Sequence, residues 1–188
     1  MSNIHEKALE RARLVSFVLK RAGIPHAIAG GLAVNALVIE ANGGIAHIRA
    51  NVDVLIERFD FQRASRFLAE YQLKLIDLKT NRRDFDAVRA IFASEKFNAR
   101  DLCLNPSLRN NTAFLTALGY INLLITPLLT MKLTAFRAID QVHVQDLMEA
   151  NLITPQIEEA LPHELRARLE SVIAEFANDL ECGVAQRI

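Results

Sequence analysis

The sequence has few of the features that mark disulfide-rich, zinc-binding or membrane proteins. Its two cysteines, Cys103 and Cys182, have neither CxxC spacing nor histidines beside them. We therefore expect free thiols in a reducing compartment, and no disulfide or zinc site. No apolar run approaches the roughly 20 residues that cross a bilayer, and the first residues do not resemble a signal peptide. These features predict a cytoplasmic protein with no membrane association.

Several functional motifs are missing as well. The sequence contains no Walker loop and no nucleophile elbow, and no stripe of aromatic and basic residues of the kind that stacks bases. The 22 basic and 22 acidic residues give a formal net charge of +0. This balance argues against a broadly basic nucleic-acid-binding surface, although a local patch is still compatible with it.

The residues that are present predict a folded protein with strands first and helices last. Of the 188 residues 51% are hydrophobic and 23% charged, which is ordinary for a soluble domain with a sizeable core. After a predicted helix over 4–21, strands alternate with helices up to about residue 125. Thr126-Pro127 then predicts the start of a helix. We expect an α/β (α+β) fold, in which a small mixed sheet flanked by helices (1–125) is followed by a helical region packed on it (126–188). The expected strands are 26–29, 51–56, 73–76, 87–92 and 120–125, and the expected helices include 32–39, 60–71, 126–137, 140–150 and two pieces starting at 154 and 162.

The stretch from His26 to Glu57 organises the chain. A short apolar strand ends at Gly30-Gly31, a helix follows, and the next strand carries Asp53. Glycine permits close approach of another group, and free N–H groups at a helix start suit a phosphate. An acidic residue on the adjacent strand would hold a metal ion beside that phosphate. A Gly-Gly pair alone more often marks a turn, so the order of the elements carries this interpretation.

This order resembles the nucleotidyltransferase superfamily with the DNA polymerase β-like fold, over about residues 24–161. Met131–Leu133, Arg137, Asp140 and Asp146 further resemble a block of AbiEii-like nucleotidyltransferases, which include toxins of bacterial toxin–antitoxin systems. The resemblance implies Mg²⁺-dependent transfer of a nucleoside monophosphate from an NTP to a hydroxyl of RNA, protein or a small molecule. It also raises the expectation of RNA or a cognate protein as partner.

The resemblance implies roles for individual residues. Asp53, Lys132 and Asp140 would be catalytic, with Asp53 as metal ligand, Lys132 as phosphate ligand, and Asp140 orienting Lys132 or assisting the acceptor hydroxyl. The expected nucleotide-binding residues are Gly30, Gly31, Arg49, Arg137, His143 and Asp146.

The metal motif of this family is incomplete here. Residues i and i+2 of a strand share a face, so an Asp-x-Asp pair would place two carboxylates side by side. In one register Asn51 and Asp53 fill the two positions, with Asn51 as a degenerate metal ligand. In the other register, which aligns Arg49 with an arginine of the family, Asp53 and Leu55 fill them. Either register leaves one carboxylate and predicts weakened metal binding.

The third carboxylate of the family is missing from its expected strand, where the central polar residue is Arg89. A cation there repels Mg²⁺ or binds a phosphate. Asp84 and Asp86 are either its substitutes or part of a solvated turn. Two functions therefore stay open: a working nucleotidyltransferase, or an inactive relative that binds a nucleotide or a partner.

Two side chains of the second block have alternative interpretations. His143 lies on the same predicted helix face as Asp140 and Asp146, and it is either a ligand or base, or a hydrogen-bonded structural residue. Lys132 lies in an apolar run and either faces the site or extends to the surface.

Overall fold

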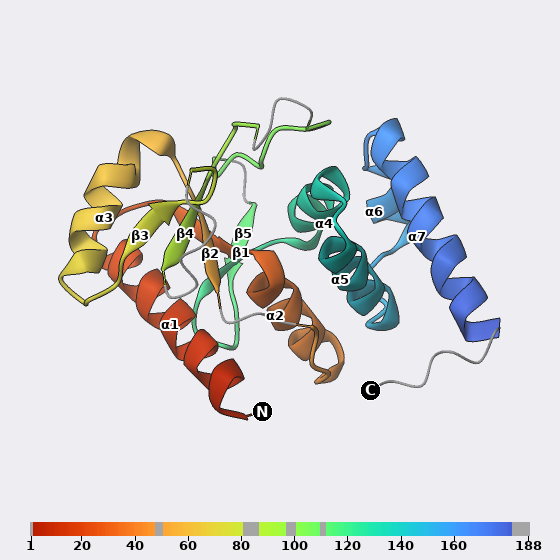
Figure 1. The fold of residues 1–188 in the computed structure, drawn as a ribbon, viewed down its shortest axis with the longest axis horizontal. Coiled ribbons are helices and arrows are strands. Elements are labelled where there is room, and N and C mark those ends of the chain that lie inside the picture. The colour runs from red at the N-terminus through yellow and green to blue at the C-terminus, as the bar shows by residue number, and fades with distance from the viewer. Residues whose placement is uncertain (1, 48–50, 81–86, 97–100, 110–111, 182–188) are drawn as a thin grey trace.

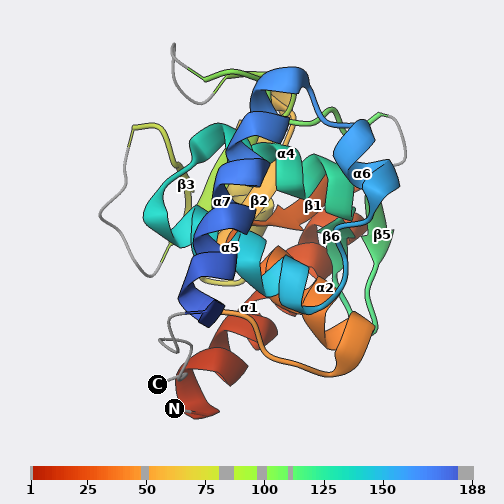
Figure 2. The ribbon, with the colours of Figure 1, turned by 90° about the vertical axis from the view of Figure 1, so that its right-hand side faces the viewer.

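The computed structural model describes residues 2–47, 51–80, 87–96, 101–109 and 112–181. A mixed sheet divides the helices into two groups (Figure 1). Helices α1 (Ser2–Arg21) and α3 (Phe61–Ala69) cover one face, and α2 (Gly30–Asn42), α4 (Ile125–Ala135) and α5 (Ala138–Glu149) cover the other. Helices α6 (Pro155–Glu159) and α7 (His163–Glu181) form the outermost layer beyond α4 and α5 (Figures 1 and 2). Among these helices, none combines the length and the apolar character that crossing a membrane requires.

The sheet has six strands in the order β3-β4-β2-β1-β6-β5. Strand β1 is antiparallel to β2 and parallel to β6, whereas β2 is parallel to β4. The fold is therefore mixed α/β with helices on both faces, as the sequence predicted. The strands are β1 (His26–Ala29), β2 (Val52–Ile56), β3 (Leu75–Asp77), β4 (Val88–Phe92), β5 (Ala113–Leu115) and β6 (Ile121–Leu123), and a short 3₁₀ helix, η1, spans Arg58–Asp60.

The register of the central strands positions Asp53. On one side Asp53 is paired with Ala29, the last residue of β1, and on the other with Arg89 of β4. Because the chain turns into α2 directly after Ala29, Asp53 lies beside both the first turn of α2 and the Arg89 side chain.

Alternation along β2 separates two hydrophobic clusters. Val52, Val54 and Ile56 belong to the cluster with α1 and α3, while Leu55 belongs to the other cluster. That second cluster joins buried residues of α2, α4, α5 and α7, including Val34, Leu129, Leu147 and Leu169. The C-terminal helices therefore share one hydrophobic core with the sheet and α2.

Some boundaries differ from the expectations. Helix α2 begins at Gly30 itself, two residues before the expected start. Thr126 is not a helix cap, because α4 begins at Ile125 and Leu124 occupies the cap position. A helical piece does start at Thr154 as expected, and the Thr154 side chain caps it by accepting from the Ile157 N–H. Strand β5 was not expected, because its three residues are too few to form a pattern, and they are half-buried or exposed. The turn expected around Asp84 and Asp86 lies outside the described residues.

Candidate functional site

A pocket of about 360 Å³ opens where β2 and β4 meet helices α2, α4 and α5. It gathers residues that are more than 100 positions apart in the sequence. One side is polar, and the rest of the lining includes apolar side chains such as Leu104, Leu128, Met131 and Ile139. Arg49, Asp84 and Asp86 lie outside the described residues, and Asp146 does not line the pocket. Eight of the residues expected at a site do line it, namely Gly30, Gly31, Asn51, Asp53, Lys132, Arg137, Asp140 and His143.

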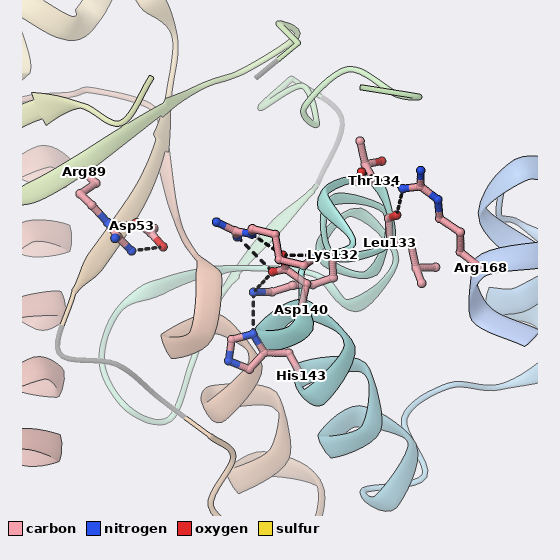
Figure 3. A network of polar contacts seen from close by, with 9 residues as sticks. Asp53, Arg89, Lys132, Leu133, Thr134, Asp140, His143 and Arg168 are labelled. Atoms are coloured by element: carbon pink, nitrogen blue, oxygen red, sulfur yellow. Dashed lines mark hydrogen bonds and ion pairs between the residues drawn. The ribbon is translucent and has the colours of Figure 1, made fainter. Parts of the chain in front are cut away.

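Arg89 forms a bidentate ion pair with the carboxylate of Asp53. Its Nε lies 2.6 Å from Oδ1 and its Nη2 lies 2.9 Å from Oδ2 (Figure 3). The side chains are only 12% (Asp53) and 18% (Arg89) exposed. A guanidinium matches a carboxylate in this geometry, and such pairs are among the stronger charge-assisted contacts. Both oxygens of Asp53 therefore have a cationic partner from the adjacent strand.

The Gly30-Gly31 pair leaves room for two site side chains. Gly30 has a φ of +69°, and a Cβ there would overlap Oδ2 of Asp53 and lie 3.1 Å from its Cγ. A Cβ at Gly31 would lie 3.1 Å from Nε2 of His143. The glycines thus let Asp53 and His143 approach the first turn of α2. No side chain caps the start of that helix.

Lys132 is buried and does not extend to the surface. It is 5% exposed, and its Nζ lies 3.2 Å from Oδ1 of Asp140. Figure 3 shows Lys132 beside Asp140. Arg137 holds the same carboxylate, with Nε 2.6 Å from Oδ2. Burial lowers the pKa of Lys132, and the charge of Asp140 opposes that shift. Burial alone would raise the pKa of Asp140, but the hydrogen bond from Arg137 and the charge of Lys132 hold it below its usual value.

The contacts of His143 define its tautomer. Its Nε2 lies 2.7 Å from the carbonyl oxygen of His47, which only accepts, so Nε2 carries the proton. Its Nδ1, 2.8 Å from Lys132 Nζ, is then the acceptor of a hydrogen bond from the ammonium. Burial and the charge of Lys132 lower the pKa of His143 to about 4. His143 is thus a neutral hydrogen-bonded residue whose two ring nitrogens are both in use.

The stability of the fold should therefore decrease in acid. The pKa of His143 is about 4 in the folded protein against an ordinary 6.5, so the unfolded chain binds more protons between these values. Stability is then full above about pH 6.5 and is lost as the pH falls toward 4, by up to about 3 kcal/mol. Urea unfolding at pH 7.5, 6 and 5 measures this loss. Buried His26, whose pKa is also lowered, adds to it.

The variant His143→Gln isolates the share of His143 in this effect. It should show a smaller change in unfolding free energy between pH 7.5 and 5 than the natural sequence does. An equal change in both proteins would mean that His143 titrates alike in the folded and unfolded chains.

Two residues that support the site had no signal in the sequence. His47 accepts from His143 through its backbone oxygen, and its N–H and Nδ1 contact the Asp146 carboxylate at 3.0 and 2.9 Å. Arg168 of α7 donates to the carbonyls of Leu133 and Thr134 at the end of α4 (Figure 3). A backbone carbonyl acceptor has no sequence pattern, so neither contact was predictable. Asp146, expected at the nucleotide, contacts His47 in the loop before β2.

The residues present do not fit a magnesium ion in this arrangement. Mg²⁺ prefers oxygen ligands and is bound through one or two carboxylates. Asp53 supplies a carboxylate, but both of its oxygens accept from Arg89. Asn51 lines the pocket on the same face and would add a neutral oxygen at best, and Leu55 lies in the hydrophobic core. A metal ion on Asp53 would therefore lie beside the Arg89 guanidinium, whose positive charge repels it.

Comparisons with protein-family models, with curated proteins and with solved structures gave no match.

Proposed function

We propose that this chain is a nucleotide-binding protein with a nucleotidyltransferase-like core that does not catalyse transfer. The observation that carries the proposal is that Gly30-Gly31, Asp53 and Lys132 line the same pocket. These are the residues on which the resemblance rests, and they come from β2, α2 and α4. The pairing of Asp53 with Arg89 favours binding over metal-dependent transfer.

The pocket lining suits a nucleotide in both size and chemistry. A volume of about 360 Å³ lies within the usual range for small-molecule sites. Lys132, Arg89 and Arg137 supply cations on the polar side for phosphates. Leu104, Leu128 and Met131 supply apolar surface for a base or sugar.

Calorimetric titration with ATP, GTP, CTP and UTP tests this proposal. We expect at least one to bind with a dissociation constant in the micromolar range or below. Arg137→Gln should weaken that binding about tenfold or more, because a hydrogen bond to a charged group contributes roughly 1.5–3 kcal/mol. The matched control is Arg21→Gln, an exposed arginine at the end of α1, which should bind as the natural sequence does.

The absence of binding by all four nucleotides would overturn the proposal. Transfer of radiolabelled nucleoside monophosphate from an NTP to RNA or protein in Mg²⁺ would instead support the working nucleotidyltransferase that the sequence motifs suggest.

A further inference from the structure

We propose that Arg89 replaces a divalent cation in this pocket, so that the pocket binds a nucleoside di- or triphosphate free of metal. This inference rests on the proposed function and narrows its ligand to the metal-free polyphosphate. Arg89 is held in place by the strand register that pairs it with Asp53. Its guanidinium is fixed by two contacts to Asp53, the side chain that lies against Gly30 at the start of α2.

The charges of the pocket lining are already balanced. Asp53, Asp101 and Asp140 carry the negative charges, and Arg89, Lys132 and Arg137 carry the positive ones. His143 is neutral because its pKa is about 4. The lining therefore has no surplus of negative charge that a divalent cation would have to neutralise.

Three cationic side chains of the pocket have N–H groups left over for a ligand. The oxygens of Asp53 and Asp140 accept from Arg89, Lys132 and Arg137. Among the contacts between described residues, Nη1 of Arg89, Nη1 of Arg137 and the third N–H of Lys132 are not used. Phosphate oxygens are acceptors, and donors of this kind match them.

A metal ion on the ligand would compete with these donors. Magnesium covers phosphate oxygens and cancels two of their charges, so those oxygens can no longer accept hydrogen bonds from the pocket. Free polyphosphate should therefore bind more tightly than the magnesium complex.

The test compares ATP, GTP, CTP and UTP titrations in EDTA with the same titrations in excess Mg²⁺. The natural sequence should bind in EDTA, and Mg²⁺ should weaken binding at least threefold. Arg89→Gln should weaken binding in EDTA about tenfold or more and should gain no dependence on metal. Circular dichroism checks that each variant is folded.

The variant Arg89→Asp reverses the charge and places a second carboxylate opposite Asp53. It should lose binding in EDTA and gain a rise in melting temperature with Mg²⁺ or Mn²⁺ alone. Arg89→Gln is the matched control for this gain, because it removes the cation without adding a carboxylate.

The outcomes separate the two proposals. Binding by the natural sequence that requires Mg²⁺ would overturn this inference and leave the proposed function standing. Unchanged affinity of Arg89→Gln in EDTA would overturn it as well. The absence of binding in both buffers would overturn the proposed function together with the inference.

Discussion

Replacing Gly30 by alanine should destabilise the fold by about 2–5 kcal/mol. The φ of +69° alone costs a residue with a side chain about 1–2 kcal/mol. The added Cβ would also overlap Oδ2 of Asp53, and relieving such overpacking typically costs about 1–3 kcal/mol more. Asp53 cannot move freely, because Arg89 holds both of its oxygens. Urea unfolding measures the loss.

Gly43→Ala is the matched control for this experiment. Gly43 has a φ of +72°, but nothing lies within 4 Å of a Cβ built there. Its replacement by alanine should therefore lower the free energy of unfolding by only about 1–2 kcal/mol, the effect of the positive φ alone. Adding Asp53→Ala to each variant should reduce the extra cost at Gly30 to the cost at Gly43. Equal costs of the two glycine variants would mean that Gly30 makes no room for Asp53.

Lys132→Met should destabilise the fold by roughly 3–5 kcal/mol, the usual effect of removing one partner of a buried ion pair. Methionine has a similar shape, so the change mainly removes the charge. Asp140 is 1% exposed and would keep only Arg137 as a cationic partner. His143 would lose the donor to its Nδ1. Thermal or urea unfolding measures the effect.

Two further variants separate the lost ion pair from a general effect of the substitution. Lys7→Met, at an exposed position of α1, should change stability by no more than about 0.5 kcal/mol. Asp140→Asn added to Lys132→Met should recover part of the loss, because the uncompensated buried charge is then gone. A Lys132→Met protein as stable as the natural sequence would contradict the claim that the buried Lys132–Asp140 ion pair stabilises the fold.

Local sequence patterns were sufficient to locate most of the elements. β1 has the expected bounds, and β2 and β4 lie within one residue of theirs, because each is a short and mostly apolar run. The cap of α4 was wrong, since Leu124 occupies it instead of Thr126, and Leu124 and Ile125 are as apolar as the strand before them. β5 was missed because a three-residue edge strand has too few residues for a pattern.

The site was predictable as a set of residues but not as a set of contacts. The sequence has Arg89 at the position where a third carboxylate was expected. From this we predicted that the site repels Mg²⁺ or binds a phosphate. The direct contact with Asp53 depends on the pairing of β2 with β4, two strands separated by more than 30 residues. The interpretation of His143 as a hydrogen-bonded residue agrees with its contacts. Its partner could not be predicted, because the acceptor is the backbone carbonyl of His47. Such long-range partners follow from the fold and have no local signal.

Crystallography of the protein grown with ATP, once in EDTA and once in Mg²⁺, tests the central claim most directly. The account predicts density for phosphates beside Arg89 and Lys132 in EDTA, with the Asp53–Arg89 contact retained. In Mg²⁺ it predicts weaker occupancy and no metal ion on Asp53. A magnesium ion bound to Asp53, with Arg89 displaced and the phosphates ordered only in its presence, would contradict the account.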